Sequence, residues 1–359
     1  MSPIPQELGQ NGDVFPAGGT LKSDQAMASP PVVIVTGASA GVGRAVALRF
    51  GDAGCRVGLM ARDEAALAAT RAEIQQRGGT ASAAAADVAD PAAVFAAADR
   101  LEQELGPVDI WINDAMETVF SRVADMTPDE FRRVTAVTYL GFVYGTMAAL
   151  KSMRPRGRGR IIQMGSALAY RGIPLQSAYC GAKHAIRGFT NSLRTELINE
   201  GSRIKVMVVE LPAVNTPQFD WARVHVSHSP RPMGAPVEPE VVADAVFRAA
   251  HGSWREYWLG GPTLLTILGN TVLPGYLDRY LAKKGIKGQQ TPALVDVERQ
   301  DNLDQPVPAL HRTRGSFSAE AGNSALLIPG EVARLGVVAA GALIFFGLGA
   351  LFAQGRRSN

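Results

Sequence analysis

Short apolar runs alternate with stretches of helical periodicity from residue 31 to about residue 260. Runs such as PVVIVTG and VDIWIND are rich in β-branched residues and are typical of strands buried on both faces. Strands are predicted at 31–37, 56–62, 80–88, 108–114, 160–166, 203–211 and 255–261. Helices are predicted at 41–52, 63–77, 91–105, 127–153 (with or without a break), 177–200 and 238–251. This alternation predicts a Rossmann-type doubly wound α/β domain, in which helices cover both faces of a parallel sheet.

Glycines, prolines and polar residues follow the predicted strands directly. In a doubly wound sheet, ligands bind beside the carboxyl ends of the strands. The residues that we therefore expect near a ligand are Gly37, Arg62, Asp87, Asn113, Ser166 and Pro212.

The regions around this α/β pattern differ from it in composition. Residues 1–29 are rich in Gly, Pro, Ser, Ala and Gln without periodicity, which predicts a disordered segment. A single domain is expected over 30–284, ending in a helical stretch that Gly and Pro interrupt. Within it, the proline-rich segment 212–236 is long enough to predict a functional or disordered loop. Residues 285–331 are poor in large apolar residues and are expected to form a linker.

The last part of the chain contains the apolar run LGVVAAGALIFFGLGALFA at 335–353. At about 1.5 Å per residue, a helix of this length approaches the thickness of a bilayer's hydrocarbon core, about 30 Å. Arg334, Arg356 and Arg357 flank the run, where they can reach lipid headgroups. We therefore expect a transmembrane tail-anchor helix over 332–354, which would make the membrane a partner of 335–353. The alternative is a helix buried at the end of the domain.

Composition and charge argue against several classes of function. The net charge is only +3 and no long Lys/Arg block interrupts the chain, so nucleic acid is not expected as a partner. Cys55 and Cys180 belong to no metal-ligand pattern, so neither a zinc site nor a disulfide framework is expected. No secretory signal is recognised, and a reducing compartment fits best.

A glycine-rich turn, TGASAGVGRA at 36–45, joins the first predicted strand to the first predicted helix. Gly37, Gly41 and Gly43 allow a tight turn and a close approach of the backbone to a ligand. The helix N-terminus beyond them offers free N–H groups and a positive dipole end to a pyrophosphate. Arg62 ends the second strand, where a guanidinium suits a ribose 2′-phosphate and favours NADP over NAD. The alternative is an ordinary surface arginine.

Tyr179 and Lys183 lie four residues apart in the helix predicted at 177–200, with only small residues between them. Residues at this spacing share one face of a helix. Alone, they fit either a half-buried tyrosine beside a lysine that extends to solvent, or a pair that transfers a proton.

Together these motifs resemble the short-chain dehydrogenase/reductase family over residues 31 to about 260. The resemblance rests on TGxxxGxG, on YxxxK, on a serine thirteen residues before the tyrosine, and on an Asp-Val pair after the third strand. In this chain these are Thr36, Gly37, Gly41 and Gly43, Tyr179 and Lys183, Ser166, and Asp87 and Val88.

The resemblance implies an oxidoreductase that transfers a hydride between NADP(H) and a small alcohol or carbonyl substrate. In the family the lysine lowers the pKa of the tyrosine and binds the nicotinamide ribose, so Tyr179 would act as general acid and base. Ser166 would bind and position the substrate oxygen. Segment 213–237 matches the substrate lid of the family, and family members often form dimers and tetramers. The aromatic lid and the apolar tail suggest a lipophilic substrate and a catalytic domain anchored on the cytoplasmic side of a membrane.

The resemblance also implies the cofactor contacts. The adenine would lie between Asp87 and Val88, the middle of the cofactor along Asn113 and Ala115, and the carboxamide end near Pro212 and Thr216. The remaining contacts would come from Gly37, Ser39, Gly41, Val42, Gly43, Arg62, Tyr179 and Lys183.

Three positions depart from the family pattern. The chain has NDAM at 113–116 where the family has Asn-Asn-Ala-Gly, which introduces Asp114 and Met116. Thr138 replaces the asparagine that holds a proton-relay water, and Ala213 replaces the glycine after Pro212. These departures keep open a second hypothesis, a catalytically silent dinucleotide-binding scaffold tethered to a membrane.

Two features of the 212–236 loop have simpler explanations beside the functional ones. His225 and His228 form an HxxH pattern without a third ligand, and we interpret them as polar loop residues rather than a metal site. Phe219 and Trp221 fit either a lid over an apolar substrate or anchors of the loop on the core.

Overall fold

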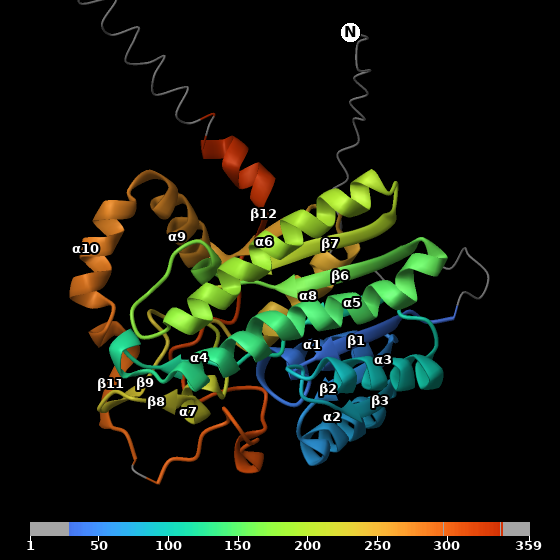
Figure 1. Ribbon diagram of the computed structural model, residues 1–359, viewed down its shortest axis with the longest axis horizontal. Helices are drawn as coiled ribbons and strands as arrows, with labels where there is room; N and C mark the ends of the chain where they lie inside the picture. The colour runs from blue at the N-terminus through green and yellow to red at the C-terminus, as the bar shows by residue number, and fades with distance from the viewer. Residues whose placement is uncertain (1–28, 297, 338, 340–359) are drawn as a thin grey trace, which may run out of the picture. The chain divides into compact units, whose positions relative to one another are not determined.

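The computed structural model describes residues 29–296, 298–337 and 339, and its domain is built on one central sheet (Figure 1). Seven parallel strands of this sheet are β1 (Val32–Thr36), β2 (Arg56–Ala61), β3 (Thr80–Ala85), β4 (Ile110–Asn113), β6 (Arg158–Met164), β7 (Arg203–Glu210) and β10 (Glu256–Leu259). An antiparallel strand, β12 (Leu327–Pro329), pairs with β10 at one edge. Within the described residues, the strand order is β12-β10-β7-β6-β4-β1-β2-β3. The predicted doubly wound parallel sheet is confirmed.

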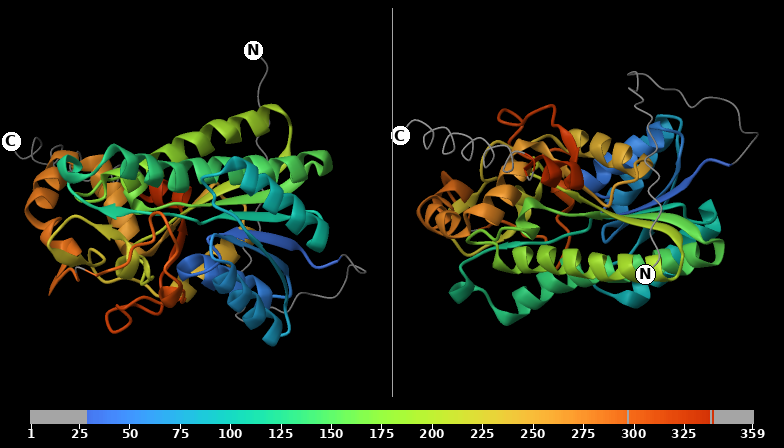
Figure 2. Two further views of the ribbon diagram at one scale, coloured as in Figure 1. Left: turned by 60° about the horizontal axis from the view of Figure 1, so that its bottom comes forward. Right: turned by 90° about the horizontal axis from the view of Figure 1, so that it is seen from above.

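Helices cover both faces of the sheet (Figure 2). One layer contains α1 (Gly41–Asp52), α2 (Glu64–Gln76) and α8 (Pro239–His251). The opposite layer contains α3 (Pro91–Leu105), α5 (Gly141–Met153) and α6 (Ser177–Asn199). The order of the chain reverses between β1 and β4, and this switch point leaves room for a ligand above the carboxyl ends of the strands.

Local capping fixes where several helices begin. The Asp63 side chain accepts a hydrogen bond from the Ala66 N–H at the start of α2, and Asp90 accepts one from Ala92 at the start of α3. Thr127 and Glu130 form a capping box at the start of α4 (Pro128–Thr135). By contrast, the N-cap position of α1 is Ala40, which supplies no side-chain cap, and no acidic residue lies in the first turn of α1. The N–H groups of this turn are therefore left to partners from elsewhere in the molecule.

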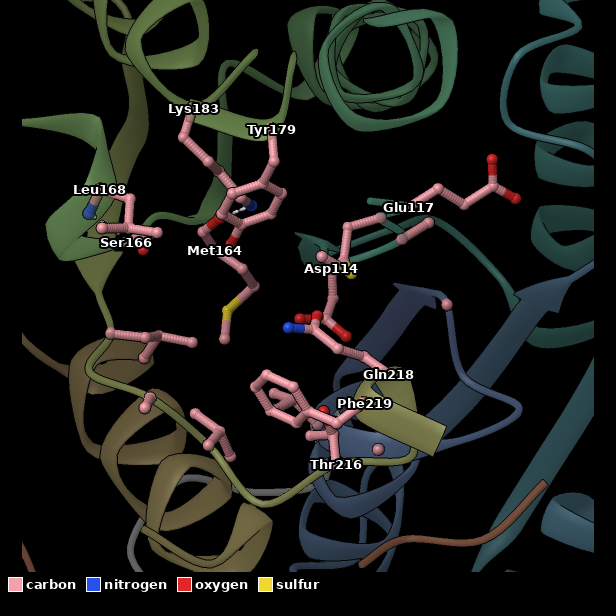
Figure 3. Close-up of a pocket in the computed structure, with 18 of the residues that line it drawn as sticks. Asp114, Glu117, Met164, Ser166, Leu168, Tyr179, Lys183, Thr216, Gln218 and Phe219 are labelled. Atoms are coloured by element: carbon pink, nitrogen blue, oxygen red, sulfur yellow. Dashed lines mark hydrogen bonds between the residues drawn. The ribbon is translucent and has the colours of Figure 1, made fainter. Parts of the chain in front are cut away.

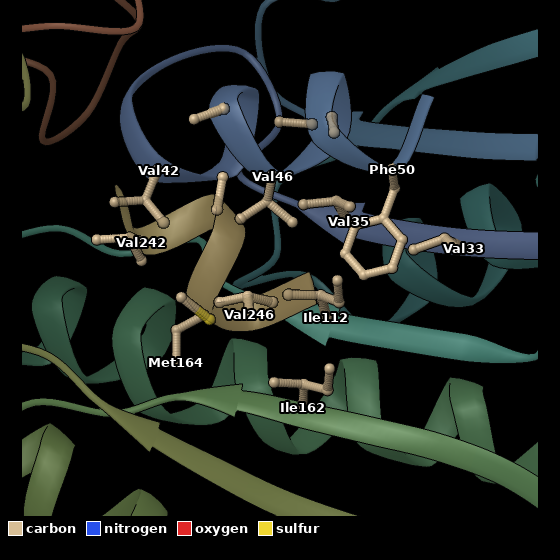
Figure 4. Packing of buried hydrophobic residues seen from close by; sticks show 14 of the residues in the cluster. Val33, Val35, Val42, Val46, Phe50, Ile112, Ile162, Met164, Val242 and Val246 are labelled. Carbon is tan, nitrogen blue, oxygen red and sulfur yellow. The ribbon is translucent and has the colours of Figure 1, made fainter. Parts of the chain in front are cut away.

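A tightly packed apolar layer holds α1 and α8 on the sheet (Figure 4). Val46 and Phe50 of α1 and Val246 of α8 are fully buried against Val35 and Ile112. Each such side chain contributes about 1.5–3 kcal/mol through its burial. This packing fixes the N-terminus of α1, and with it the glycine-rich turn, relative to the strand ends.

The helix predicted at 127–153 is interrupted by a break. A π-helical turn, η2 (Ala136–Leu140), separates α4 from α5. Thr138 lies in this turn, where its buried hydroxyl donates to the Glu117 carbonyl oxygen at 2.9 Å and accepts from the Glu117 N–H at 3.0 Å. The turn is thereby joined to the segment that follows β4.

The proline-rich segment at 212–236 contains short structural elements. Helix α7 (Gln218–Trp221) is followed by β8 (Arg223–Val224), which pairs with β5 (Val119–Phe120), and by β9 (His228–Pro230). Further along, α9 (Gly260–Val272) and α10 (Pro274–Lys284) form the expected helical stretch.

The expectation of a linker over 285–331 is wrong. Strand β11 (Gln290–Leu294) pairs with β9, and β12 extends the central sheet. Leu303 and Val307 are only 1% and 4% exposed. Although the segment is poor in apolar residues, Leu303 and Val307 are buried in the domain. Backbone carbonyl oxygens of the segment also accept hydrogen bonds from Arg62 and Arg133. The amino-acid composition of the segment reveals neither the burial of two side chains nor these backbone hydrogen bonds.

Both ends of the chain fall largely outside the described residues. The expected disordered segment 1–29 has only Ser29 within them. Residues 330–337 are helical, and most of the expected tail-anchor helix at 332–354 lies beyond the described part. Among the residues that the structure describes, no helix combines the length and the apolar character needed to cross a bilayer.

Candidate active site

A cavity of about 430 Å³ lies at the carboxyl ends of the strands. Its walls come from the glycine-rich turn, the ends of β2, β4 and β6, one face of α6, the 212–236 segment, and α9 and α10. This volume falls in the range of small-molecule sites, about 300–1,000 Å³. All the predicted site residues line this cavity except Asn113 and Gly43.

The glycine-rich turn forms a cradle without side chains at one side of the cavity. Gly37 has φ of 75°, which a residue with a Cβ rarely adopts. A Cβ on Gly43 would lie 2.3 Å from the Gly37 carbonyl oxygen, so the turn is closed by backbone contact. Ser39 and Val42 line the cavity beside it. This geometry fits a dinucleotide whose pyrophosphate approaches the N-terminus of α1.

Tyr179 and Lys183 project side by side from α6 into the cavity (Figure 3). Burial raises the pKa of the Tyr179 phenol, and its hydrogen bond with Ser166 opposes that shift. The phenol is therefore protonated at neutral pH in this structure. A protonated phenol can donate a proton, so the arrangement suits a general acid.

Lys183 is only 3% exposed, and its ammonium is bound to the end of β6. Nζ donates to the Met164 carbonyl oxygen at 2.6 Å and lies 4.6 Å from the centroid of the Phe142 ring. Burial lowers the pKa of Lys183, and the carboxyls of Asp114 and Glu210 oppose this. Nζ is 5.5 Å from the centroid of the Tyr179 ring. The pKa of the Tyr179 phenol is raised in this structure, chiefly by burial, so the expected net lowering is not found.

Ser166 follows β6 and is held by a buried carboxyl that the sequence analysis missed. The Ser166 N–H donates to Glu210 Oε2 at 2.6 Å, and its hydroxyl oxygen accepts from the Leu168 N–H at 3.1 Å. Burial, helped by the charge of Glu256, raises the pKa of Glu210 to about 8. An acidic residue at the end of the apolar strand VMVVE was the one sequence signal for this partner.

Asn113 was expected along the cofactor wall, but the structure places its side chain in the core. Its Oδ1 accepts from Trp111 Nε1 at 2.8 Å, and its Nδ2 donates to Thr146 at 3.1 Å and to Gln163 at 2.9 Å. This network joins β4 to α5 and β6, so the Asn113 side chain stabilises the core next to the strand ends. Ala115, two residues on, lines the cavity as expected.

The departures from the family pattern occupy distinct places. Asp114 lines the cavity beside the glycine-rich turn, where its carboxyl accepts a hydrogen bond from the Gly43 N–H. Burial raises the pKa of Asp114, while Lys183 opposes the shift. Met116 also lines the cavity. The Thr138 hydroxyl is fully engaged with the Glu117 backbone, as described above.

At the far end of the cavity, Arg62 is already paired. Its guanidinium contacts Glu117 Oε1 at 2.7 Å and donates to the carbonyl oxygens of Asn302 and Leu303. Burial raises the pKa of Glu117 to about 8, against the opposing charges of Arg62 and Arg133. Arg133 also pairs with Asp87 at 2.8 Å, and Asp87 and Val88 line the cavity. No sequence pattern had indicated Glu117 or residues 302–303.

The 212–236 segment closes another side of the cavity. The lining residues of this segment include Pro212, Thr216, Phe219 and Trp221. Figure 3 shows Thr216 and Phe219 across the cavity from Tyr179. The Phe219 ring also packs on those of Phe120 and Phe317, with centroids 6.0 and 5.8 Å away, so it is both a lid residue and an anchor.

The histidines of the HxxH pattern are bound to neighbouring residues. His225 Nε2 lies 2.8 Å from Glu130 Oε1, and His228 Nδ1 lies 2.9 Å from the Ser227 hydroxyl. Over the described part of the chain, no group of three or more His, Cys, Asp or Glu side chains is placed to hold a metal ion.

A doubly wound sheet with a glycine-rich turn after its first strand and a serine, tyrosine and lysine in one cavity defines a class, the nucleotide-dependent oxidoreductases. The comparisons make this specific. A family model described as short chain dehydrogenase matches residues 31–224. The chain therefore belongs to the short-chain dehydrogenase family and is an NAD(P)-dependent oxidoreductase of that family.

Individual relatives agree with this assignment. An uncharacterized oxidoreductase of Bacillus subtilis, YxnA, is 32% identical over 256 residues, which cover 70% of this chain and 71% of that protein. Dehydrogenase/reductase SDR family member 7B of Bos taurus is 30% identical over 274 residues, covering 72% of this chain and 83% of that one.

Solved structures show the same fold. A metagenomic short-chain oxidoreductase in complex with NADP is 28% identical with a TM-score of 0.52, and the match covers 62% of this chain and 91% of that one. The F189W actinorhodin polyketide ketoreductase with NADPH is 31% identical with a TM-score of 0.50, covering 52% of this chain and 72% of that one.

Proposed function

We propose that the protein is an NADP(H)-dependent reductase of apolar carbonyl compounds, in which Tyr179 is the general acid. The observation that carries this proposal is that Ser166, Tyr179 and Lys183 line one cavity together with the glycine-rich turn. In the reverse direction, the same tyrosine would act as general base toward an alcohol.

The cavity fits a nicotinamide dinucleotide along its length. Gly37, Ser39, Gly41 and Val42 would hold the pyrophosphate, and Asp87 and Val88 would flank the adenine. Ala115, Pro212 and Thr216 would line the nicotinamide half. When bound, NADPH supplies the hydride and the protein supplies orientation and charge.

The protein's own residues would manage the proton. The Tyr179 phenol, kept protonated by burial, would donate its proton to the carbonyl oxygen as that oxygen gains negative charge. Ser166 would donate a hydrogen bond to the same oxygen, with its backbone held by Glu210. The buried Lys183 ammonium would stabilise negative charge at the phenol after proton loss.

NADP(H), rather than NAD(H), is supported by two observations. Arg62 stands at the end of β2, where a guanidinium suits a 2′-phosphate, and it lines the cavity. The two family structures described above contain NADP or NADPH.

An apolar substrate is supported by the apolar wall that α10 and the lid segment give the cavity. There Leu277 and Leu281 of α10 line the cavity together with Tyr280 and Phe219. Large apolar side chains are also exposed on the outside of α9 and α10, at Leu265 and Tyr276. Apolar walls favour substrates that lose little hydration on binding.

The membrane tether is a separate part of the proposal. Residues 335–353 would anchor the protein as a C-terminal helix, with the catalytic domain on the cytoplasmic side. Its support is the uncharged length of the run and the arginines that flank it. Fractionation of cells that express the full chain, or a chain ending at residue 339, tests it. The full chain should pellet with membranes and resist a carbonate wash, and recovery of both chains in the supernatant would contradict the tether.

The catalytic proposal is tested by NADPH oxidation across ketones and aldehydes of increasing apolar size. We expect turnover that rises with the apolar size of the carbonyl compound, and much weaker turnover with NADH. Tight binding of NADPH without turnover on a broad panel would instead support the silent scaffold.

A further inference from the structure

Residues 299–316, here named the strap, cross the adenosine end of the cavity. On the domain side, the Arg312 carbonyl oxygen accepts from the Gly41 N–H at 3.0 Å, and the Leu303 carbonyl oxygen accepts from Arg133 Nε at 3.0 Å. The His311 carbonyl oxygen accepts from Arg44 at 3.3 Å. The strap therefore joins the glycine-rich turn, α1 and α4 through its own backbone.

The strap is also bound to the lid segment. Arg223 pairs with Asp301 at 2.9 Å and with Asp304 at 2.7 Å, and Arg312 pairs with Asp220 at 2.7 Å. The Asn302 N–H donates to the Trp221 carbonyl oxygen at 3.0 Å. Lid and strap thus form one connected cover.

The strap leaves the cavity open beneath it. Pro306, Val307 and His311 line the same cavity as Ser39, Gly41 and Arg62. The strap is therefore a wall of the cofactor site rather than an occupant of it.

His311 stands out among the strap residues that line the cavity. Its side chain is 9% exposed, and neither ring nitrogen makes a hydrogen bond of regular geometry. Nε2 lies 3.2 Å from Asp63 Oδ2, and the ring centroid is 5.3 Å from that of Trp221. A buried imidazole with free hydrogen-bonding capacity is costly unless a ligand satisfies it.

The charges around His311 suit a phosphate. Burial lowers the pKa of the His311 imidazole, and the nearby charges of Arg62 and Arg44 add to this shift. The Asp63 carboxylate and the Ser39 backbone oppose it. The Arg62 guanidinium contacts the Glu117 carboxyl at 2.7 Å, and Glu73 pairs with Arg44 at 2.7 Å. A phosphate monoester carries about −1.5 to −2 charge at pH 7, so the single positive charge of Arg62 does not balance it. Negative charge beside an imidazole favours its protonated form, so a bound phosphate would let His311 supply the second positive charge.

We propose that the strap completes the cofactor site and that His311 binds the 2′-phosphate of NADP(H). This inference rests on the proposed NADP(H) dependence. It assigns cofactor discrimination partly to a segment that lies outside the glycine-rich turn and β2.

The test compares binding of 2′,5′-ADP and 5′-AMP, which differ by the 2′-phosphate, measured by calorimetry on the full chain. The wild type should prefer 2′,5′-ADP strongly. His311→Ala should reduce this preference about tenfold or more, the usual effect of losing a hydrogen bond to a charged group. His311→Lys should retain most of it, and the matched control His228→Ala, on the lid outside the cavity, should leave it unchanged.

Three results would overturn the inference. In the first, His311→Ala leaves the preference for 2′,5′-ADP and both affinities unchanged. In the second, His311→Ala lowers the affinities for 2′,5′-ADP and 5′-AMP equally, which would make His311 a support of the strap only. In the third, His311→Ala binds 2′,5′-ADP more tightly, which would make the strap an obstruction. A wild type that binds neither 2′,5′-ADP nor NADPH would instead refute the proposed function.

A second measurement uses the wild type alone and so does not depend on the folding of a variant. Trypsin cleaves after Arg312 and Arg314, which lie in the strap. If the strap covers the 2′-phosphate, 2′,5′-ADP should slow cleavage there more than 5′-AMP does at equal occupancy. Equal protection by the two ligands would contradict the proposal.

Discussion

The two ends of the cavity are assembled in different ways. At the nicotinamide end, Ser166, Tyr179 and Lys183 come from one strand end and the helix that follows it. At the adenosine end, Arg62 meets carbonyl oxygens of residues about 240 positions later in the chain. The first end is fixed by the core of the domain, whereas the second depends on a surface segment. We infer that chemistry and cofactor retention can be disturbed separately.

The largest expected effect is at the nicotinamide end. Tyr179→Phe removes the proton donor and should lower kcat by roughly 10²–10⁴-fold, the usual contribution of a general acid. NADPH affinity should stay within a few-fold of the wild type, because the lost hydroxyl serves chemistry. Steady-state kinetics and a binding titration measure the two quantities.

The matched control for this variant is Tyr280→Phe, which removes a phenolic hydroxyl from the substrate side of the same cavity. It should change kcat only a few-fold. Equal losses in the two variants would contradict the role assigned to Tyr179.

The nicotinamide end could be predicted from the sequence because its residues are close in the chain and their spacing is a known motif. A helix places Tyr179 and Lys183 on one face whatever the rest of the fold does. The sheet order likewise follows from alternating strands and helices. These features depend on local periodicity, which a sequence displays.

The adenosine end could not be predicted in the same way. The strap is held through backbone carbonyl oxygens, which every residue has, so nothing in the sequence marks Leu303 or Arg312 as partners of Arg133 or Gly41. Asn113 illustrates a related limit. Its position after β4 was predicted, but whether its side chain faces the cavity or the core depends on Trp111 and Thr146.

The second largest effect should follow from loosening the strap. Leu303 packs with Val119, Val134 and Ala178 in a cluster that also touches Tyr179. Leu303→Ala should lower the free energy of unfolding by about 2–5 kcal/mol, through lost burial and the cavity left behind. Denaturant titration measures this loss. Leu294→Ala, at a residue 71% exposed, is the control and should change stability by less than about 0.5 kcal/mol. Equal stability losses in Leu303→Ala and Leu294→Ala would mean that Leu303 does not anchor the strap.

A third variant separates cofactor recognition from catalysis. Arg62→Ala removes the guanidinium at the end of β2 and should raise the Kd for NADPH by about 10–100-fold, while the Kd for NADH changes little. Arg132→Ala, at a side chain 78% exposed on α4, is the control. A parallel loss of affinity for both cofactors would show that Arg62 acts only by holding the strap and Glu117.

The smallest effect concerns the departure at Asp114. Burial raises the pKa of this carboxyl to about 7, so it ionises as the pH passes through neutrality. A carboxylate beside the glycine-rich turn repels a pyrophosphate, so NADPH affinity should fall a few-fold from about pH 6 to about pH 8.5. In Asp114→Asn this part of the pH dependence should disappear. If NADPH affinity fell more steeply with pH in Asp114→Asn than in the wild type, the proposed repulsion by the Asp114 carboxylate would be contradicted.

The central claim is that one cavity holds the cofactor between the Tyr179 phenol and the strap. A crystal structure with NADPH bound tests it most directly. We predict that the Tyr179 and Ser166 hydroxyls converge beside C4 of the nicotinamide while the strap covers the 2′-phosphate. A nicotinamide ring bound away from the Tyr179 hydroxyl, or a strap displaced from a bound adenosine, would contradict the account.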